Sequence, residues 1–363
     1  MNRRGFLKAL GLGAAFLAVP NCTAGPVTPA ATKLHKRPNI VFILIDDMGW
    51  TDVGCYGSRF HETPNIDRLA SHGMKFTDAA LGFIEDNKDK PFFLFLSHHT
   101  VHIPLEAPEE LVRKYENKTR PSTGVNNPVY AAMVEHLDNS VGRILKKLGD
   151  LKLEQNTLVV FFSDNGGLYQ PFGGYTGKRQ VVSTNAPLRD EKGTLYEGGV
   201  REPLIVRWPG VINAGTTCSV PVTSVDFYPT FMEIVDARGD ANHVLDGRSI
   251  LPLLRQTGTL GRDAIYWHYP HYHHSRPAGA IRQGDWKLIE FYEDGRLELY
   301  NLKDDIGEKE NLAAKVPEKA AELQGRLAAW RKSVGAKMPA PNPDYDSARA
   351  NEWGGRQQKK PRK

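Results

Sequence analysis

The chain has 363 residues, of which 40% are hydrophobic and 25% are charged, with 34 glycines and 24 prolines. This composition excludes fibrous and disordered proteins, argues against an all-helical bundle, and fits one large α/β domain with an appendage. The net charge is +5, but residues 1–24 carry +3 and residues 337–363 carry +4, which leaves −2 between them. Basic charge confined to the two ends is not a nucleic-acid-binding stripe, so we predict no nucleic-acid partner.

The first 24 residues have the order of a bacterial export signal. Arg3 and Arg4 precede a modestly apolar run, Ala9–Val19, and small residues follow it. The run is too short to cross a membrane, so we predict a signal peptide and no transmembrane segment. The arginine pair resembles the twin-arginine signal, which predicts export by the twin-arginine machinery to the periplasm or the medium. Cys22 is a candidate for lipid attachment, although Asn21 before it fits that motif poorly.

The residues after the signal alternate between apolar runs and helical patterns. A helix is predicted from Thr63 to His72, with Pro64 at its first position, and a longer one carries an apolar face from Tyr130 to Leu148. Strands that alternate with helices predict a doubly wound, mostly parallel α/β sheet. The apolar runs that predict its buried parallel strands are 40–45, 92–96, 158–162 and 204–206.

From about Leu254 the pattern changes to short aromatic-rich runs separated by turns, which predict an antiparallel sheet. A helix with Ala320, Leu323 and Leu327 on one face follows, and then a polar, proline-rich tail. We therefore predict an α/β domain over residues 36–254, a smaller C-terminal α+β subdomain over 255–336, and a disordered basic tail over 337–363.

Polar side chains follow two of the predicted strands. Asp46 and Asp47 come after the first strand, and Asp164 and Asn165 come after the third. Because ligands bind outside the carboxyl ends of parallel strands, we expect these four side chains to converge. Carboxylates brought together need a cation, and an all-oxygen set predicts Ca²⁺ or Mg²⁺ rather than zinc. The alternative interpretation is that Asp46 and Asp164 only cap the loops that follow their strands.

Two further segments offer groups for an anion at that edge. The second strand ends in a histidine-rich stretch, residues 97–104, in which we favour His102 as the functional imidazole. Lys192 lies in a glycine-containing loop ahead of the fourth strand, which suits either an anion-binding turn or an ordinary solvated one.

These residues lie in segments that resemble the type I sulfatases of the alkaline-phosphatase-like fold, the arylsulfatase A and N-acetylgalactosamine-6-sulfatase types in particular. The resemblance covers Lys36 to Met338 in the order of that family. The segments that carry it include RPNIVFILIDDMGWTDVGCYG, TPNIDRLASHGMKFTDA, HHTVHIPLEAP, NTLVVFFSDNGG and NAPLRDEKGTLYEGGVREPLIVRWPGVI.

The resemblance implies a sulfuric ester hydrolase that acts on sulfated glycans or aryl sulfates. It implies that Asp46, Asp47, Asp164 and Asn165 hold Ca²⁺, and that Lys192 and His102 contact the sulfate and act in catalysis. In this family the nucleophile is a formylglycine hydrate, made from the cysteine of a Cys-x-Pro-x-Arg motif.

That motif is absent from the sequence. After Ala80 the chain continues directly into residues that resemble the helix before the second strand, so we infer an internal deletion near residues 80–82. Cys55 has Arg59 four residues on but Gly57 where the motif needs proline, and we interpret it as an ordinary buried cysteine. Without a nucleophile no sulfoenzyme intermediate forms, which predicts an inactive or nearly inactive chain.

Residues 266–274 form a run of tyrosines and histidines. We interpret it as part of the substrate rim, with His268 as a binding residue and zinc binding as the alternative. Two alternatives to a sulfatase also stay open: a noncatalytic periplasmic binder of sulfated glycans, and a truncated gene product.

Overall fold

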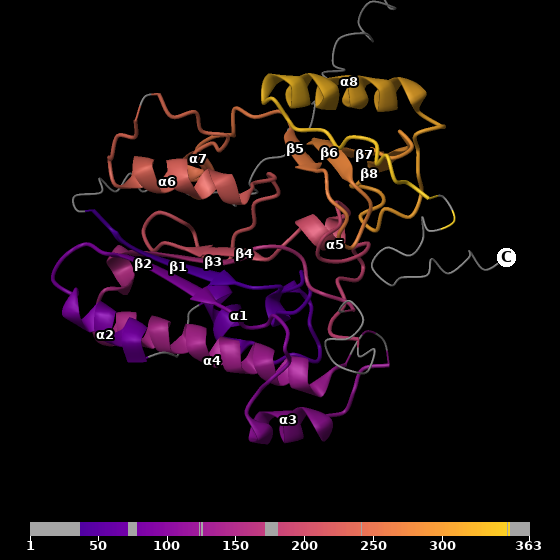
Figure 1. The fold of residues 1–363 in the computed structure, drawn as a ribbon. Coiled ribbons are helices and arrows are strands. Elements are labelled where there is room, and N and C mark those ends of the chain that lie inside the picture. Colours follow the sequence, from indigo (N-terminus) through magenta and orange to yellow (C-terminus); the bar gives the residue numbers. More distant parts are fainter. Residues whose placement is uncertain are drawn as a thin grey trace, which may run out of the picture.

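The computed structural model describes residues 37–71, 78–122, 124, 126–170, 181–240, 242–346 and 348. The predicted signal over residues 1–24, which includes Cys22, and residues 349–363 lie outside the described residues. The described chain forms two four-stranded sheets, each covered by helices, as Figure 1 shows.

The first sheet has the strand order β2-β1-β3-β4. Strand β1 pairs in parallel with both β2 and β3, and Ile45 at its end lies opposite His98 and Ser163. The fourth strand runs antiparallel to β3, which corrects our prediction of four parallel strands. Three parallel strands therefore end at one edge. The strand bounds are β1 Asn39–Ile45, β2 Phe93–His98, β3 Thr157–Ser163 and β4 Leu204–Arg207.

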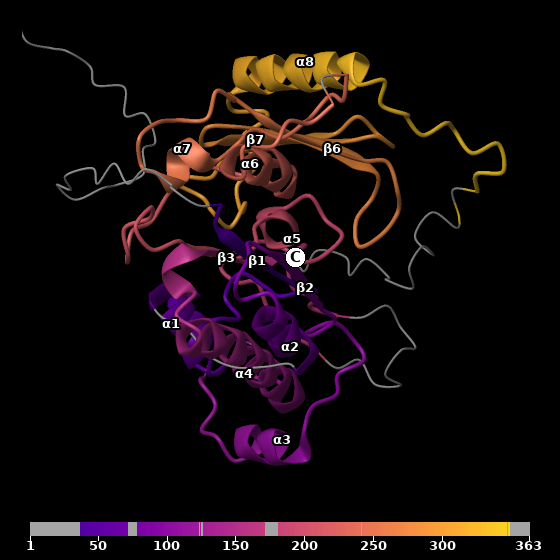
Figure 2. The same cartoon turned by 90° about the vertical axis from the view of Figure 1, so that its left-hand side faces the viewer.

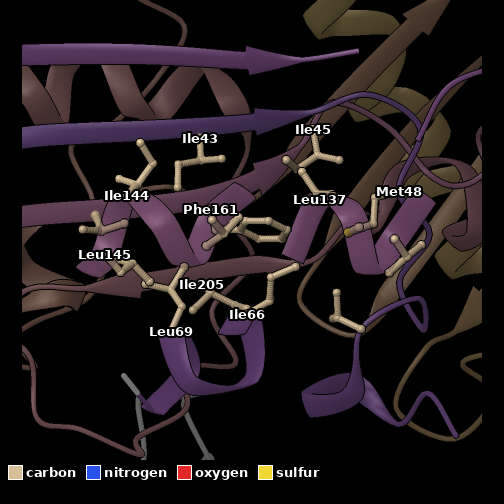
Figure 3. Close-up of a cluster of buried hydrophobic side chains, with 14 of the residues drawn as sticks. Ile43, Ile45, Met48, Ile66, Leu69, Leu137, Ile144, Leu145, Phe161 and Ile205 are labelled. Atoms are coloured by element: carbon tan, nitrogen blue, oxygen red, sulfur yellow. The ribbon is translucent and has the colours of Figure 1, made fainter. Parts of the chain in front are cut away.

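Helices α1, α2 and α4 cover one face of this sheet, and α3 packs on the outer side of α4 (Figure 1). Figure 3 shows the core between them, where Ile43 and Phe161 of the sheet meet Leu137 and Ile144 of α4. The long helix contains the predicted apolar face from Tyr130 to Leu148, and it begins at Pro128 because the Asn127 side chain accepts the first free backbone N–H groups. The bounds are α1 Pro64–Ser71, α2 Asp78–Asp86, α3 Glu109–Glu116 and α4 Pro128–Asp150.

The opposite face of the sheet packs against α6 (Phe227–Ile234) and α7 (Leu251–Leu254). This cover reaches β1 and β3 but leaves β2 incompletely covered. Phe93 is 51% exposed and Phe95 is 53% exposed, although Phe95 stacks on Phe42 of the neighbouring strand. The second strand is therefore a half-exposed edge strand, which corrects our prediction that it is buried.

The second sheet is an antiparallel meander in the order β5-β6-β7-β8 (Figure 1). Figure 2 shows α8 lying over it. Helix α8 covers one of its faces through Leu323 and Leu327, and the other face packs on Leu195 and Tyr196, just before α5. An α/β sheet followed by a smaller antiparallel α+β unit is the predicted fold class, and it is confirmed. The bounds are α5 Glu197–Val200, β5 Ile265–Tyr269, β6 Ala278–Gln283, β7 Trp286–Phe291, β8 Leu297–Asn301 and α8 Pro317–Ser333.

A buried group of charges joins the second sheet to α5. Lys287 of β7 is 0% exposed, and its Nζ lies 2.9 Å from Glu197 of α5 and 3.0 Å from Glu308. The Glu308 carboxylate also accepts the backbone N–H of Glu197. Because buried charges are stable only when paired, this group fixes the segment that follows Lys192 against the second sheet.

Candidate functional site

The structure brings together the four polar residues that follow β1 and β3. The backbone N–H groups of Asp47 and Asn165 both donate to Asp164 Oδ1, at 3.1 and 2.9 Å. The Asn165 amide nitrogen donates to Asp47 Oδ1 at 2.9 Å. Asp47 is 2% exposed and has a φ of 63°, a backbone conformation that places its carboxylate across the end of β3. Parallel pairing of β1 and β3 thus produces the predicted juxtaposition.

The carboxylates of Asp46, Asp47 and Asp164 form a dense negative cluster. One oxygen from each lies within 4.8 Å of the others. Burial and the two neighbouring carboxylates raise the pKa of Asp164 above its usual range. Asp47 Oδ2 is buried and accepts no hydrogen bond from the described residues. A hard divalent cation would neutralise this cluster and use that oxygen, so the residues present fit Ca²⁺.

Lys192 and His102 both reach this cluster. The Lys192 ammonium lies 2.6 Å from Asp47 Oδ1, and His102 Nε2 lies 3.6 Å from Asp47 Oδ2. His102 Nδ1 lies 2.6 Å from the carbonyl oxygen of Ile103, which can only accept, so Nδ1 carries the proton. In the neutral ring Nε2 therefore has its lone pair directed toward the carboxylates.

A recess of about 310 Å³ opens beside the cluster, between the ends of β1 and β2. Asp46, His99 and Asp164 contribute its polar lining, and Leu44 and Ile45 contribute apolar atoms. His99 Nδ1 lies 3.5 Å from Asp46 Oδ2. The recess has room for a small anionic group next to three carboxylates and two imidazoles.

Two residues singled out from the sequence lie elsewhere. His268 is on β5, where its ring nitrogens contact the Tyr292 hydroxyl at 2.7 Å and the Lys337 carbonyl at 2.9 Å. Cys55 is exposed, which corrects our interpretation of it as a buried residue. Partial burial of its sulfur and the neighbouring Asp67 carboxylate raise the pKa of the thiol to about 12, so it carries almost no thiolate at neutral pH.

Asn185 is a buried connector that the sequence reasoning missed. Its Oδ1 accepts the N–H of Gly167 at 3.1 Å. Its Nδ2 donates to the carbonyls of Gly167 at 2.8 Å and Asp190 at 3.1 Å. Gly167 follows Asp164 closely and Asp190 precedes Lys192, so Asn185 joins the loop after β3 to the lysine turn.

The histidine-rich run of the second unit supports the same turn from its other side. His274 Nδ1 lies 3.5 Å from Glu191, next to Lys192. Gly193 has a φ of 76°, and a Cβ atom there would lie 2.0 Å from Nδ1 of His273. Only glycine fits between this ring and the turn. No local pattern in the sequence pairs these two segments.

The Asp52 carboxylate holds the loop that follows Asp47. It accepts hydrogen bonds from the Gly49 N–H at 2.8 Å, the Tyr130 hydroxyl at 2.5 Å and the Ser183 hydroxyl at 2.8 Å. The His61 ring packs beside it, with Nδ1 3.0 Å from the Asp52 carbonyl, and burial lowers the pKa of that ring. The chain after Asp47 is thus held by three buried donors.

The described helices include none with the length and hydrophobicity needed to cross a membrane.

The sequence matches two protein-family models. Residues 38–82 and 74–237 match the model described as Sulfatase, in two segments that meet around residues 74–82. Residues 190–333 match the model described as N-sulphoglucosamine sulphohydrolase, C-terminal. The first match spans the whole carboxylate cluster and Lys192, and the second spans the sheet that supports the lysine turn.

Individual proteins show the same likeness. The chain is 38% identical over 280 residues to a protein named Sulfatase from Formosa agariphila, across 70% of this chain and 49% of that protein. The chain spans about half or less of the length of the curated relatives it matches.

Two solved structures share the fold. The structure of Ps i-CgsB in complex with k-i-k-neocarrahexaose has a TM-score of 0.69 and 22% sequence identity, over 81% of this chain and 93% of that one. A second, in complex with its substrate D-glucosamine-2-N,6-O-disulfate, has a TM-score of 0.62 and 21% identity, over 84% and 99%.

Proposed function

Because the chain belongs to the sulfatase family, we propose that its carboxylate cluster binds Ca²⁺ and that the loaded site binds a sulfate ester. The observation that carries this proposal is the buried Asp47 Oδ2, which has no hydrogen-bond donor among the described residues and faces two further carboxylates. The ligands we propose are Asp46, Asp47, Asp164 and Asn165.

The charges of the cluster explain why a cation must bind before the anion. Three carboxylates and the Lys192 ammonium leave two net negative charges at the site when all are ionised. Such a site repels sulfate, whereas a divalent cation brings the local charge to zero. Bound Ca²⁺ also supplies a Lewis acid that polarises a sulfate oxygen.

Lys192 and His102 then have separate roles toward the bound ester. The ammonium of Lys192 stands directly beside the cluster, where it binds and orients an anionic oxygen. His102 holds its proton at Nδ1 through the Ile103 carbonyl, so Nε2 is the nitrogen that takes up a proton and would then donate it to the leaving oxygen. A group at this position serves as acid and base.

We further propose that this chain binds sulfate esters but hydrolyses them at trace levels at most. Its sequence contains no Cys-x-Pro-x-Arg motif, and the Cys55 thiol is protonated at neutral pH. These residues therefore support a protein that binds sulfated glycans without hydrolysing them. The substrate class rests on the glucosamine disulfate held by one structural neighbour.

The break in the sulfatase match supports the alternative of a gene product that has lost an internal block. The two matched segments meet at residues 74–82, where the family motif is missing. Sequencing the locus across Ala80–Gly82 decides this point. An uninterrupted reading frame identical to the present one upholds the binder, and an additional block there would restore the enzyme.

The location and division of the chain remain proposals as well. The Arg3-Arg4 pair and the apolar run after it support export to the periplasm by the twin-arginine machinery. The change from a parallel to an antiparallel sheet supports a division near residue 254.

Calorimetric titration of the full chain with D-glucosamine-2-N,6-O-disulfate tests the binding site. We expect binding in the presence of Ca²⁺, none after chelation, and none for unsulfated D-glucosamine. Lys192→Met should lose sulfate binding while keeping Ca²⁺ binding, and Lys315→Met, which changes an exposed lysine outside the site, serves as the matched control.

A turnover assay with 4-nitrophenyl sulfate, together with mass spectrometry of the Cys55 peptide, tests the absence of catalysis. Rapid turnover, or a formylglycine at residue 55, would falsify it. Sulfate binding that is equally strong without any divalent cation would contradict the charge argument.

A further inference from the structure

A second set of potential ligands lies beside the carboxylate cluster and differs from it in chemistry. One ligand atom each from Asp46, His99 and His102 lies within 4.8 Å of the other two. The two rings face each other at a centroid distance of 5.2 Å, and His99 Nδ1 is 3.5 Å from Asp46 Oδ2. Two imidazoles and a carboxylate form a ligand set suited to zinc, not to calcium.

The contact of His102 with the Ile103 carbonyl already orients its ring as in a metal ligand. Its Nδ1–H donates to the Ile103 carbonyl at 2.6 Å, so the lone pair of the neutral ring is on Nε2. Metal-ligating histidines typically donate their second ring N–H to a carbonyl or carboxylate in this way, which fixes the tautomer and the ring orientation. The His102 ring is thus oriented before any ion arrives.

The three ligand atoms reach the distances of a zinc site after a small rotation of the exposed His99 ring. Ligand atoms of a tetrahedral zinc site with bonds of about 2.0–2.1 Å lie roughly 3.4 Å apart. The His99–Asp46 pair already has this separation, and the His99 side chain is 70% exposed, so its ring can turn without disturbing the core. Asp46 has two carboxylate oxygens and can face both cations.

We propose that Asp46, His99 and His102 form a zinc-binding site next to the proposed calcium site. Three protein ligands leave the fourth tetrahedral position open, as in zinc sites that exchange a ligand. Asp46 and His99 both line the recess, so this open position faces a space that admits water or one oxygen of a small anion. The inference goes beyond the proposed function, and bound zinc would exclude proton transfer by His102, because it would occupy the Nε2 lone pair that takes up the proton.

The test titrates the Ca²⁺-loaded full chain with Zn²⁺ in competition with a chromophoric zinc chelator. We expect one zinc ion per chain. Loss of an outer-shell partner typically weakens metal affinity 10–100-fold, so removing a ligand through His99→Ala should weaken zinc binding by at least about tenfold. His102→Ala should do the same. His271→Ala, which changes an exposed histidine in the other histidine-rich segment, should leave the affinity unchanged.

X-ray absorption at the zinc edge provides a readout independent of affinity and of activity. We expect two imidazole ligands in the parent chain and one in His99→Ala. His99 is exposed, so this variant folds even where His102→Ala does not, which circular dichroism verifies. Zinc binding unchanged in His99→Ala overturns the proposal, and so does loss of zinc in His271→Ala. The Ca²⁺-dependent sulfate titration is run separately without zinc, so each proposal fails or holds alone.

Discussion

The two sheets of this molecule differ in how completely they are covered. The second sheet is packed on both faces, by α8 on one side and by Leu195 and Tyr196 on the other, and it has the fully buried Lys287 at its centre. The first sheet has the cation-binding edge, yet its strand β2 leaves Phe93 and Phe95 half exposed. The supports of Lys192 are therefore intact, while the sheet that positions the carboxylates has an uncovered border.

The uncovered border lies close to the place where the family match divides. The second sheet keeps its packing and its contacts with the lysine turn. The first sheet has an apolar border strand next to α2, and α2 overlaps residues 74–82, where the two matched segments of the sulfatase model meet. The proposed loss of an internal block predicts this arrangement, because such a loss would leave apolar surface without its cover.

Replacing Lys287 should have the largest effect on the well-covered side. Lys287→Ala leaves Glu197 and Glu308 buried without their counter-charge, so we expect a loss of about 3–5 kcal/mol in the free energy of unfolding. Lys315→Ala removes an exposed ion pair with Glu310 and should cost less than about 1 kcal/mol. Urea denaturation measures both. Equal effects would mean that the second sheet is not held by its buried charges.

Asn185 connects the two sides, and its removal should have the next largest effect. Asn185→Ala breaks three buried hydrogen bonds, for which we expect a loss of about 2–3 kcal/mol. It should also weaken sulfate binding more than Ca²⁺ binding, because it frees the turn that carries Lys192. Asn242→Ala, in an exposed turn, is the control. An unchanged sulfate affinity in Asn185→Ala would contradict the connecting role.

A substitution at the exposed border of β2 should change stability less and should change self-association clearly. Phe95→Thr keeps strand propensity and loses the stack on Phe42, at a cost of about 1 kcal/mol. We expect less self-association by sedimentation velocity, because an uncovered apolar edge strand is an aggregation site. A chain that is monomeric before the substitution would show that the border is already protected.

Lowering the pH from 7 to 5 should have the smallest effect on stability. Burial lowers the pKa of His61, so the fold favours the neutral ring. The stability from this group is complete above its unfolded pKa of about 6.5 and declines as the pH falls below it. His61→Asn retains a donor toward Asp52 but does not titrate, so its melting temperature should change less between pH 7 and pH 5. His271→Asn should behave like the parent chain.

Much of the fold follows from local sequence patterns. The apolar runs placed all four strands of the first sheet, and the apolar face from Tyr130 to Leu148 placed the long helix. The direction of β4 was missed because a run of three apolar residues has the same pattern in either direction. The exposure of β2 was missed because an apolar run predicts burial only if another element is present to cover it.

The candidate site was predictable where it depends on strand ends. Asp47 and Asp164 converge because β1 and β3 are parallel neighbours, and that pairing could be predicted. The contacts of Asn185 and His274 join segments that come together only after the sheets pack, so no local pattern indicates them. Whether the predicted residues act on sulfate remains a prediction.

The close approach of His273 to Gly193 sets a limit on dividing this protein. A fragment that ends near residue 254 would keep every proposed calcium ligand, but its lysine turn would lose the ring packed against it and the partner of Glu191. We expect such a fragment to hold a cation without selecting an anion. The two units are therefore not independent. The first sheet carries the carboxylate cluster, and the second unit supports the turn that carries Lys192, the proposed anion-binding residue.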